Sequence, residues 1–166
     1  MDRDGASETG ETSEESQGLE DVSREEEHEL WGLLIQTRDL LVNLRDRDVR
    51  HLGITSMQGG ALWVVRALEI EGTAATPAEI SRRLFRQPPP TLALLNRMAK
   101  LGLITCTESS EGRRQVLVAL TDKGRETFRA YMRARKVIPR VLGSISPEER
   151  LQLRSSLAKV RQKARE

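Results

Sequence analysis

The side chains best suited to chemistry in this sequence are cationic, and many of them fall between residues 76 and 124. Guanidinium and ammonium groups bind phosphate oxygens, while Arg, Gln and Thr side chains also hydrogen-bond to base edges in a DNA groove. The stretch therefore predicts a nucleic-acid contact surface. The alternative is a solvated basic face, and for Arg97 a structural ion pair. The candidate residues are Arg82, Arg83, Arg86, Gln87, Thr91, Arg97, Lys100, Arg113 and Arg114.

The pattern around these residues predicts the elements that would position them. A capping box from Thr76 to Glu79, with proline at the first helical position, predicts a short helix over residues 76–84. A second helix follows the break at residues 86–88 and stops at Gly102. Two apolar strands, residues 103–107 and 115–120, then flank a polar tip that holds two arginines. This order is typical of a winged helix-turn-helix, whose second helix enters the major groove and whose hairpin tip reaches the minor groove.

Charge is distributed unevenly along the 166 residues. Residues 1–28 hold 11 Asp and Glu against two Arg, a net charge of −9, whereas the remaining residues carry +11. A segment so acidic and so poor in apolar residues cannot bury enough surface to offset its ordering, so residues 1–28 are predicted to be a disordered tail. The tail is expected to be a solubilising segment or an internal DNA mimic that competes with the basic face. The basic domain is predicted at residues 29–166, and its charge is typical of phosphate-binding proteins.

Two apolar helical regions lie outside the predicted DNA-reading module at residues 76–124. Residues 29–50 carry leucines at spacings of three and four. Residues 125–164 are predicted to hold a long helix that Pro139 interrupts and a last helix opened by a capping box from Ser146 to Glu149. Both regions are expected to be dimerisation helices, which would set two reading helices about 34 Å apart. The predicted fold is mainly α with a small β-hairpin wing.

Two local features predict how the helices pack. Gly59 and Gly60, near the start of a helix capped at residue 55 or 56, are expected to allow close approach of a neighbouring helix, and the alternative is a hinge. Within and directly after the short helix over residues 76–84, Ile80, Leu84 and Phe85 are expected to face the core.

One run in this stretch is specific enough to suggest a family. Thr76-Pro77-Ala78-Glu79-Ile80 and residues 94–104 precede a run, residues 112–124, that contains the pattern Arg-Arg-x-x-x-Val-x-Leu-Thr-x-Lys-Gly. These residues resemble the wing and adjoining helices of the MarR family of bacterial transcription regulators. The resemblance implies a homodimer that binds pseudo-palindromic operators in double-stranded DNA and usually represses. It also implies release by a small phenolic or other lipophilic effector, by oxidation or, occasionally, by metal.

Two departures from the family pattern concern DNA readout. Gly112 stands where the family commonly has an aspartate that braces the arginine matching Arg114. Residues 88–90 are all proline where the family's reading helix offers hydrogen-bonding side chains. Specificity is therefore expected to depend on recognition of groove width by the wing and on three residues near the helix start. They are Arg86, Gln87 and Thr91.

Aromatic and polar side chains on several predicted helices could line an effector pocket between the dimerisation helices and the DNA-reading module. The alternative is ordinary core packing. The candidate pocket residues are Trp31, Gln36, Arg38, Met57, Trp63 and Tyr131.

The remaining reactive residue types indicate no catalytic or metal chemistry. Cys106, the single cysteine, is expected to be a small buried strand residue, and its isolation is typical of a protein from a reducing cytoplasm. His28 and His51 are expected to lie on the surface, because they have no cluster of metal-ligating residues around them. No stretch is apolar enough to cross a membrane, and no cofactor motif is present.

The sequence favours one of three classes of function. It is that of a sequence-specific, dimeric DNA-binding repressor released by a small-molecule effector. The alternative is a winged-helix protein-interaction module without an operator. An enzyme is not expected, because the sequence offers no nucleophilic triad, glycine-rich phosphate loop or paired carboxylates to assign.

Overall fold

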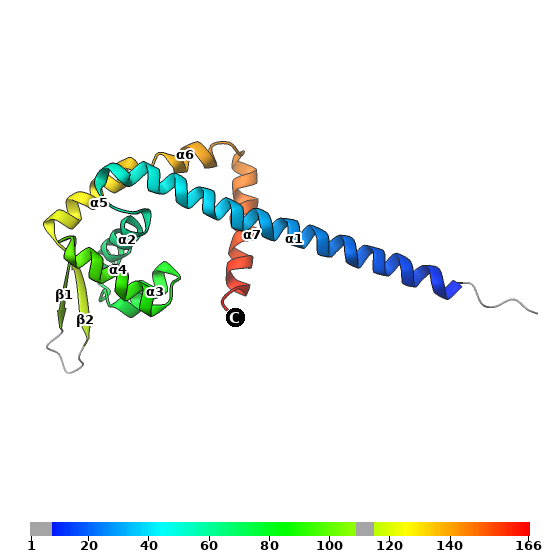
Figure 1. Ribbon diagram of the computed structural model, residues 1–166, viewed down its shortest axis with the longest axis horizontal. Helices are drawn as coiled ribbons and strands as arrows, with labels where there is room; N and C mark the ends of the chain where they lie inside the picture. Colours follow the sequence, from blue (N-terminus) through cyan, green and yellow to red (C-terminus); the bar gives the residue numbers. More distant parts are fainter. Residues whose placement is uncertain (1–7, 109–114) are drawn as a thin grey trace, which may run out of the picture. The chain divides into compact units, whose positions relative to one another are not determined.

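The computed structural model describes residues 8–108 and 115–166. The chain forms two compact units, Met1–Asn43 and Leu44–Glu166. Figure 1 shows the described elements in chain order, from blue to red. They are α1 (Glu8–Val49), the short 3-10 helix η1 (Arg50–Leu52), α2 (Ser56–Ile70), α3 (Pro77–Leu84), α4 (Pro88–Lys100), β1 (Ile104–Glu108), β2 (Val116–Leu120), α5 (Asp122–Ala134), α6 (Val137–Leu142) and α7 (Pro147–Lys163).

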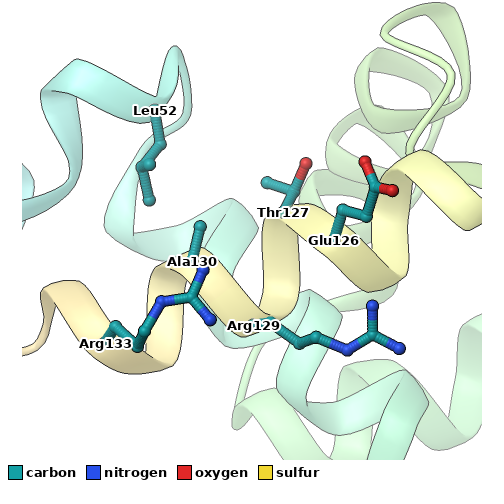
Figure 2. A pocket seen from close by; sticks show the side chains of 6 residues that line it. All are labelled: Leu52, Glu126, Thr127, Arg129, Ala130 and Arg133. Carbon is teal, nitrogen blue, oxygen red and sulfur yellow. The ribbon is translucent and has the colours of Figure 1, made fainter.

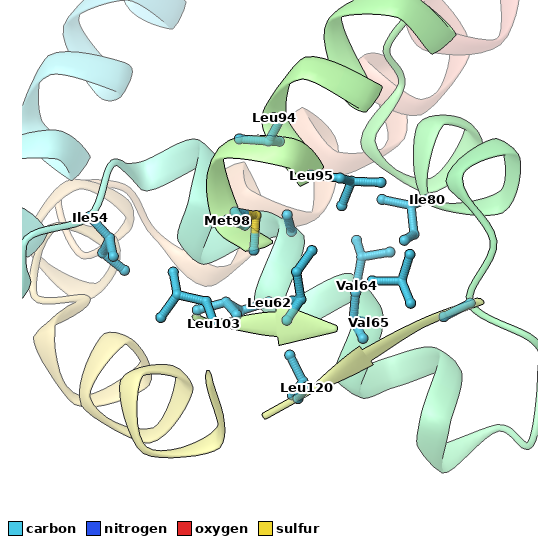
Figure 3. Close-up of a cluster of buried hydrophobic side chains, with 14 of the residues drawn as sticks. Ile54, Leu62, Val64, Val65, Ile80, Leu94, Leu95, Met98, Leu103 and Leu120 are labelled. Carbon is cyan, nitrogen blue, oxygen red and sulfur yellow. The ribbon is translucent and has the colours of Figure 1, made fainter. Parts of the chain in front are cut away.

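Helix α2 contacts α3, α5 and β2 within the Leu44–Glu166 unit. Its start is the predicted one, because Thr55 and Gln58 form a reciprocal capping box, with the Thr55 N–H donating to Gln58 Oε1 at 2.8 Å. Burying each large aliphatic side chain completely stabilises the fold by about 1.5–3 kcal/mol. The largest completely buried side chains, several of which are drawn in Figure 3, are Leu62, Leu68, Ile80, Leu95, Met98 and Leu103.

The two strands form the predicted antiparallel hairpin. Their register pairs Ile104 with Leu120 and Cys106 with Val118. On the other edge of β2, the Val118 N–H donates to the Ala75 carbonyl at 2.8 Å. The base of the wing is therefore hydrogen-bonded to the loop before α3, so hairpin and helix-turn-helix are held together.

The close approach expected at Gly59 is confirmed. A Cβ atom at this position would lie 2.2 Å from the ring of Tyr131, so only glycine allows α5 to pack so near to α2. The Tyr131 side chain is buried, and its hydroxyl accepts a hydrogen bond from Arg45 at 3.2 Å. Tyr131 is thus a core residue with a satisfied polar atom.

The interruption predicted at Pro139 is confirmed, although it lies a few residues earlier. Helix α5 ends at Ala134 and α6 begins at Val137. Proline lacks an N–H, and its ring clashes with the carbonyl four residues before it, here that of Arg135. The new helix start is stabilised by Asp48, whose carboxylate accepts from the Val137 N–H at 2.7 Å.

The N-terminal segment differs from the prediction. Residues 1–28 were expected to be disordered; residues 1–7 lie outside the described residues, and from Glu8 onwards the segment belongs to α1. Once residues near Val49, which is buried, are held in a helix, each further residue adds one hydrogen bond, so extension costs far less than nucleation. Glu is also a good helix former, which a criterion based on hydrophobic burial ignores. Among the described residues, no helix is long and apolar enough to cross a membrane.

Candidate nucleic-acid interface

The helix-turn-helix consists of α3 and α4. Helix α3 begins after Thr76, whose side chain accepts from the Glu79 N–H, and it has Pro77 in its first turn. Helix α4 begins at Pro88 without a side-chain cap. The prolines at residues 88–90 cause no loss of helical hydrogen bonds, because the first N–H groups of a helix have no partner within it.

Five of the predicted contact residues are exposed, namely Arg82 on α3, Arg86 and Gln87 in the turn, and Arg97 and Lys100 on α4. In the described part of the chain, Arg86, Arg97 and Lys100 form no ion pair or side-chain hydrogen bond. The structural ion pair considered for Arg97 is therefore not formed there. Exposed cations without carboxylate partners are able to bind phosphate.

The prediction for Thr91 is wrong. Its side chain has 0% exposure, and its hydroxyl donates to the Gln87 carbonyl at 3.0 Å. Thr91 lies on the face of α4 that also buries Leu94, Leu95 and Met98. A buried hydroxyl must find an internal partner, and the carbonyl one turn earlier supplies it.

Asn96 is a residue that the sequence reasoning missed. It is exposed and lies on the same side of α4 as Leu92 and Lys100, four residues away in each direction. An Asn side chain is able to form a two-point contact with adenine. The sequence feature that could have identified Asn96 is its position four residues before Lys100, which puts both residues on one side of a helix.

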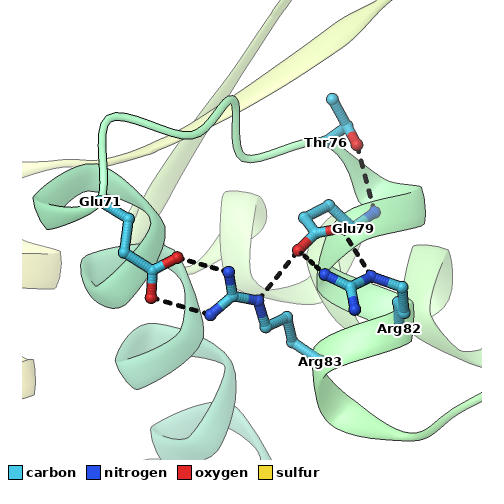
Figure 4. A network of polar contacts seen from close by, with 5 residues as sticks. All are labelled: Glu71, Thr76, Glu79, Arg82 and Arg83. Atoms are coloured by element: carbon cyan, nitrogen blue, oxygen red, sulfur yellow. Dashed lines mark hydrogen bonds and ion pairs between the residues drawn. The ribbon is translucent and has the colours of Figure 1, made fainter.

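Arg82 and Arg83 are held in an ionic network (Figure 4). Both guanidinium groups donate to Glu79, with Nε distances of 2.8 Å from Arg82 and 2.9 Å from Arg83. Arg83 also reaches across to α2, where its Nη1 donates to Glu71 at 2.9 Å. Arg83 is largely committed to joining α2 and α3, whereas the Arg82 side chain is still 69% exposed.

The capping box expected at Thr76 forms only in part. The Thr76 hydroxyl accepts from the Glu79 N–H, but the Glu79 carboxylate does not return to the Thr76 N–H, which instead donates to the Ala74 carbonyl. Charge-assisted bonds to two guanidinium groups are stronger than a bond to a neutral amide. The hydrogen bond from Arg82, which has the largest effect, and that from Arg83, which has the next largest, lower the pKa of Glu79 from 4.5 to about 2.

We predict that acid weakens the fold through this network. The folded-state pKa of Glu79 lies below its ordinary value of 4.5, so its contribution is fully present above pH 4.5 and is lost as the pH falls towards 2. The difference in Tm between the wild type and Glu79→Gln should therefore shrink over this interval. Glu126→Gln, at an exposed carboxylate without an ion pair in the described chain, is the control. A difference for Glu79→Gln that is independent of pH would refute the prediction.

The residues after the wing explain the specific pattern in the sequence. The Thr121 hydroxyl donates to the Gly102 carbonyl at 2.6 Å and accepts from the Gly124 N–H at 2.9 Å. The Lys123 ammonium donates to the Leu101 carbonyl at 2.8 Å, at the C-terminal end of α4. The Thr-x-Lys-Gly run thus starts α5 and anchors it to the end of α4.

Glu69 makes a second connection that the sequence reasoning missed. Its carboxylate accepts from Arg125 at 2.8 Å, from Arg66 at 3.2 Å and from the Leu120 N–H at 3.4 Å. Burial is the largest single influence and raises the pKa of Glu69, but these hydrogen bonds together lower it below its ordinary value. The ion pair links α2, β2 and α5. The one feature of the sequence that could have indicated this ion pair is Arg125, which directly follows the wing pattern.

Three further expectations concern the hairpin and the neighbouring α3. The tip arginines, Arg113 and Arg114, lie outside the described residues together with Gly112. The prediction that Cys106 is buried is wrong, because the strand carries it beyond the core to an exposed position. Partial burial still raises the pKa of its thiol, which keeps it protonated at neutral pH. Phe85 was expected to face inward but is 59% exposed.

The predicted effector residues are spread over the chain. Trp31, Gln36 and Arg38 belong to the Met1–Asn43 unit, and all three are exposed. In the Leu44–Glu166 unit, Trp63 and Met57 are exposed, while Tyr131 is buried as the core-packing alternative expected. His28 and His51 lie on the surface as predicted.

An open groove of about 470 Å³ runs along α5, beside η1 (Figure 2). None of the predicted effector residues lines it. Its lining is polar and carries two guanidinium groups, which does not fit a lipophilic ligand. The lining residues are Leu52, Glu126, Thr127, Arg129, Ala130 and Arg133.

The arrangement of helix, turn, helix and hairpin, with exposed cations on the second helix, defines a winged helix DNA-binding protein. Residues 57–124 match the family model described as a winged helix DNA-binding domain. The HTH-type transcriptional repressor MdtR of Bacillus subtilis is 31% identical over 113 residues, which cover 68% of this chain and 70% of MdtR.

Solved structures agree with this assignment. The organohalide-sensing regulator RdhR, in its 2,4-dichlorophenol-bound form, is 27% identical with a TM-score of 0.73, over 82% of this chain and 79% of RdhR. The MarR family regulator AbsC of Streptomyces coelicolor has the same fold, at 19% identity and a TM-score of 0.71, over 82% of this chain and 92% of AbsC. The chain belongs to the MarR family of transcriptional regulators. The predicted family and fold class are confirmed, and the protein-interaction module is not favoured.

Proposed function

We propose that this regulator is a homodimeric repressor that acts in the cytoplasm, binds a pseudo-palindromic operator and is released by a small effector. The observation that carries the DNA-binding part is that Arg86 in the turn and Arg97 and Lys100 on α4 are exposed and have no carboxylate partners in the described chain. Contacts from such cations to phosphates hold a protein in register on the duplex, and a helix between them reads bases.

Readout by α4 combines apolar and polar contacts. Leu92 and Ala93 are exposed and suit contact with thymine methyl groups, while Asn96 suits adenine. We assign phosphate contacts to Arg82, Arg97 and Lys100. We assign Gln87 and Arg86 to the entry of the major groove, and Arg113 and Arg114 to the minor groove. Arg83 is a positioning residue, because Glu71 and Glu79 already hold it.

Exposed apolar side chains support the dimer. Residues 29–50 and 125–164 are assigned as dimerisation helices of a domain spanning residues 29–166. Large apolar side chains left in water usually mark an interface. Those on α1 are Leu30, Trp31, Leu33, Ile35 and Leu40, and those on α7 are Leu151, Leu153, Leu157 and Val160.

The chemistry of the effector is inferred from RdhR, whose structure holds 2,4-dichlorophenol and whose sequence is 27% identical to this chain. A small phenolic ligand that prefers a dimer with unsuitable spacing of its reading helices would release the operator by population shift. Trp31, Gln36, Arg38, Met57 and Trp63 stay candidates for its site.

A DNA-selection experiment with the purified protein, followed by binding of the enriched pool over a salt series, tests the function. We expect an inverted repeat with half-sites about one turn apart. We also expect affinity to fall as salt rises, with a slope that counts phosphate contacts. Enrichment of no sequence, with only weak binding, would contradict an operator-binding repressor.

Arg97→Ala is predicted to weaken binding about equally for all sequences and to reduce the salt slope by about one unit for each lost phosphate contact. The cause is the loss of one exposed cation on α4. Arg97→Lys keeps the charge and should retain most of the slope. Fluorescence anisotropy with an operator and a scrambled duplex measures both variants. An unchanged slope for Arg97→Ala would remove this residue from the interface.

A further inference from the structure

The turn between α3 and α4 contains an unusual residue. Phe85 ends α3 with φ 54° and ψ 44°, the left-handed conformation that glycine normally supplies at this position. It is the one non-glycine residue with positive φ in the part of the chain that the structure describes. Its ring is also 59% exposed, so neither backbone preference nor core packing explains a phenylalanine here.

Two arginines from the C-terminal end of the chain lie over this ring. The guanidinium carbon of Arg165 is 4.5 Å from the ring centre, and that of Arg161 is 5.5 Å away. The two residues are four positions apart, so they project from the same side of the chain where α7 ends. A guanidinium within about 6 Å of an aromatic centre is held by the ring quadrupole.

The two arginines over Phe85 carry positive charge that no carboxylate among the described residues neutralises. Two guanidinium groups, those of Arg161 and Arg165, lie over the Phe85 ring, and Arg86 is the next residue of the turn. None of the three arginines has a carboxylate partner among the described residues. The nearby carboxylate in sequence, that of Glu166, pairs with Lys163 instead. Stacking occupies the face of a guanidinium but leaves its N–H edges available. Guanidinium groups whose N–H donors are available bind anions such as phosphate through strong charge-assisted hydrogen bonds.

We infer that Arg161 and Arg165 contact the DNA backbone beside the start of the reading helix, with Phe85 as the platform that orients them. This inference rests on the DNA-binding function proposed above. The anion is a backbone phosphate, because the turn directly precedes α4, whose first residues approach the major groove. Phe85 thereby connects the end of α7 to the helix-turn-helix.

The position of Arg161 on α7 requires a control for the dimer. At about 100° per residue, Arg161 is rotated by about 100° from Val160 but by only about 40° from Leu157 around the helix axis. Val160 and Leu157 are exposed and are assigned to the dimer. The oligomeric state of the arginine variants is therefore measured beside their DNA affinity.

The test is a salt series on the full-length protein with operator and scrambled duplexes. The double variant Arg161→Ala/Arg165→Ala should bind both duplexes at least about tenfold more weakly, with the salt slope reduced by about one unit for each lost contact. Lys159→Ala, which removes a charge from the opposite side of α7, should leave affinity and slope unchanged. Phe85→Leu should weaken binding in the same direction but less, because the charges remain while their platform is lost.

Thermal melting and sedimentation would show that the variants stay folded and keep the wild-type oligomeric state. Wild-type affinity and slope in the double variant would overturn the role of the C-terminal arginines and leave the proposed function intact. An equal loss in Lys159→Ala would also overturn it, since the effect would then be one of net charge. A wild-type protein without salt-dependent DNA binding would overturn the proposed function itself.

Discussion

Gly124→Ala is expected to lower the free energy of unfolding by about 3 kcal/mol, the upper end of the usual cost of overpacking. A Cβ atom at this position would lie 1.9 Å from the Leu103 carbonyl oxygen. That oxygen cannot move aside cheaply, because it accepts from the Thr121 N–H at 3.2 Å and belongs to the chain entering the wing. Relief of the clash would separate α5 from β1.

Thermal and denaturant unfolding measure this effect, and operator binding should weaken as the wing loses its support. Gly32→Ala is the matched control, because a Cβ there meets no atom within 4 Å. Gly32 lies inside α1, so alanine should be neutral or slightly stabilising. Equal stability of the wild type and Gly124→Ala would mean that the close approach to Leu103 does not occur.

Leu157→Asp is expected to convert the dimer to a monomer and to weaken operator binding by about 100-fold or more. The reason is that two linked DNA-binding sites bind an operator with an affinity about 100-fold or more above that of one site. The Leu157 side chain is 42% exposed, and Leu153 and Val160 accompany it on α7. A carboxylate in the middle of an apolar contact would be desolvated without a partner. Removal of α7 by truncation after Ser144 should have the same effect.

Sedimentation measures the oligomeric state, and binding to whole operators and half-sites measures the loss of linkage. Ser155→Asp introduces the same charge on the other side of α7, about 200° away from Leu157, and should leave the dimer intact. Dimers in both Leu157→Asp and the truncated chain would place the interface elsewhere.

The local features of this protein follow from the sequence. Four helices start after a capping residue whose hydroxyl accepts the N–H three residues later, namely Thr55, Thr76, Thr121 and Ser146. The wing strands follow from short apolar runs between polar segments. Such signals depend on neighbouring residues alone, so no knowledge of distant parts is needed to recognise them.

The tertiary structure decided which side chains of the candidate site are available. Thr91 and Arg97 stand on the same helix, but packing of α4 buries one and leaves the other exposed. Arg83 is taken up by Glu71, 12 residues away, whose position depends on how α2 meets α3. Phe85 was assigned to the core by helical spacing, yet the left-handed end of α3 turns it outward beneath two arginines from the far end of the chain. Burial and charge pairing arise between segments distant in sequence, so local patterns can name candidate residues, but only packing decides which of them reach DNA.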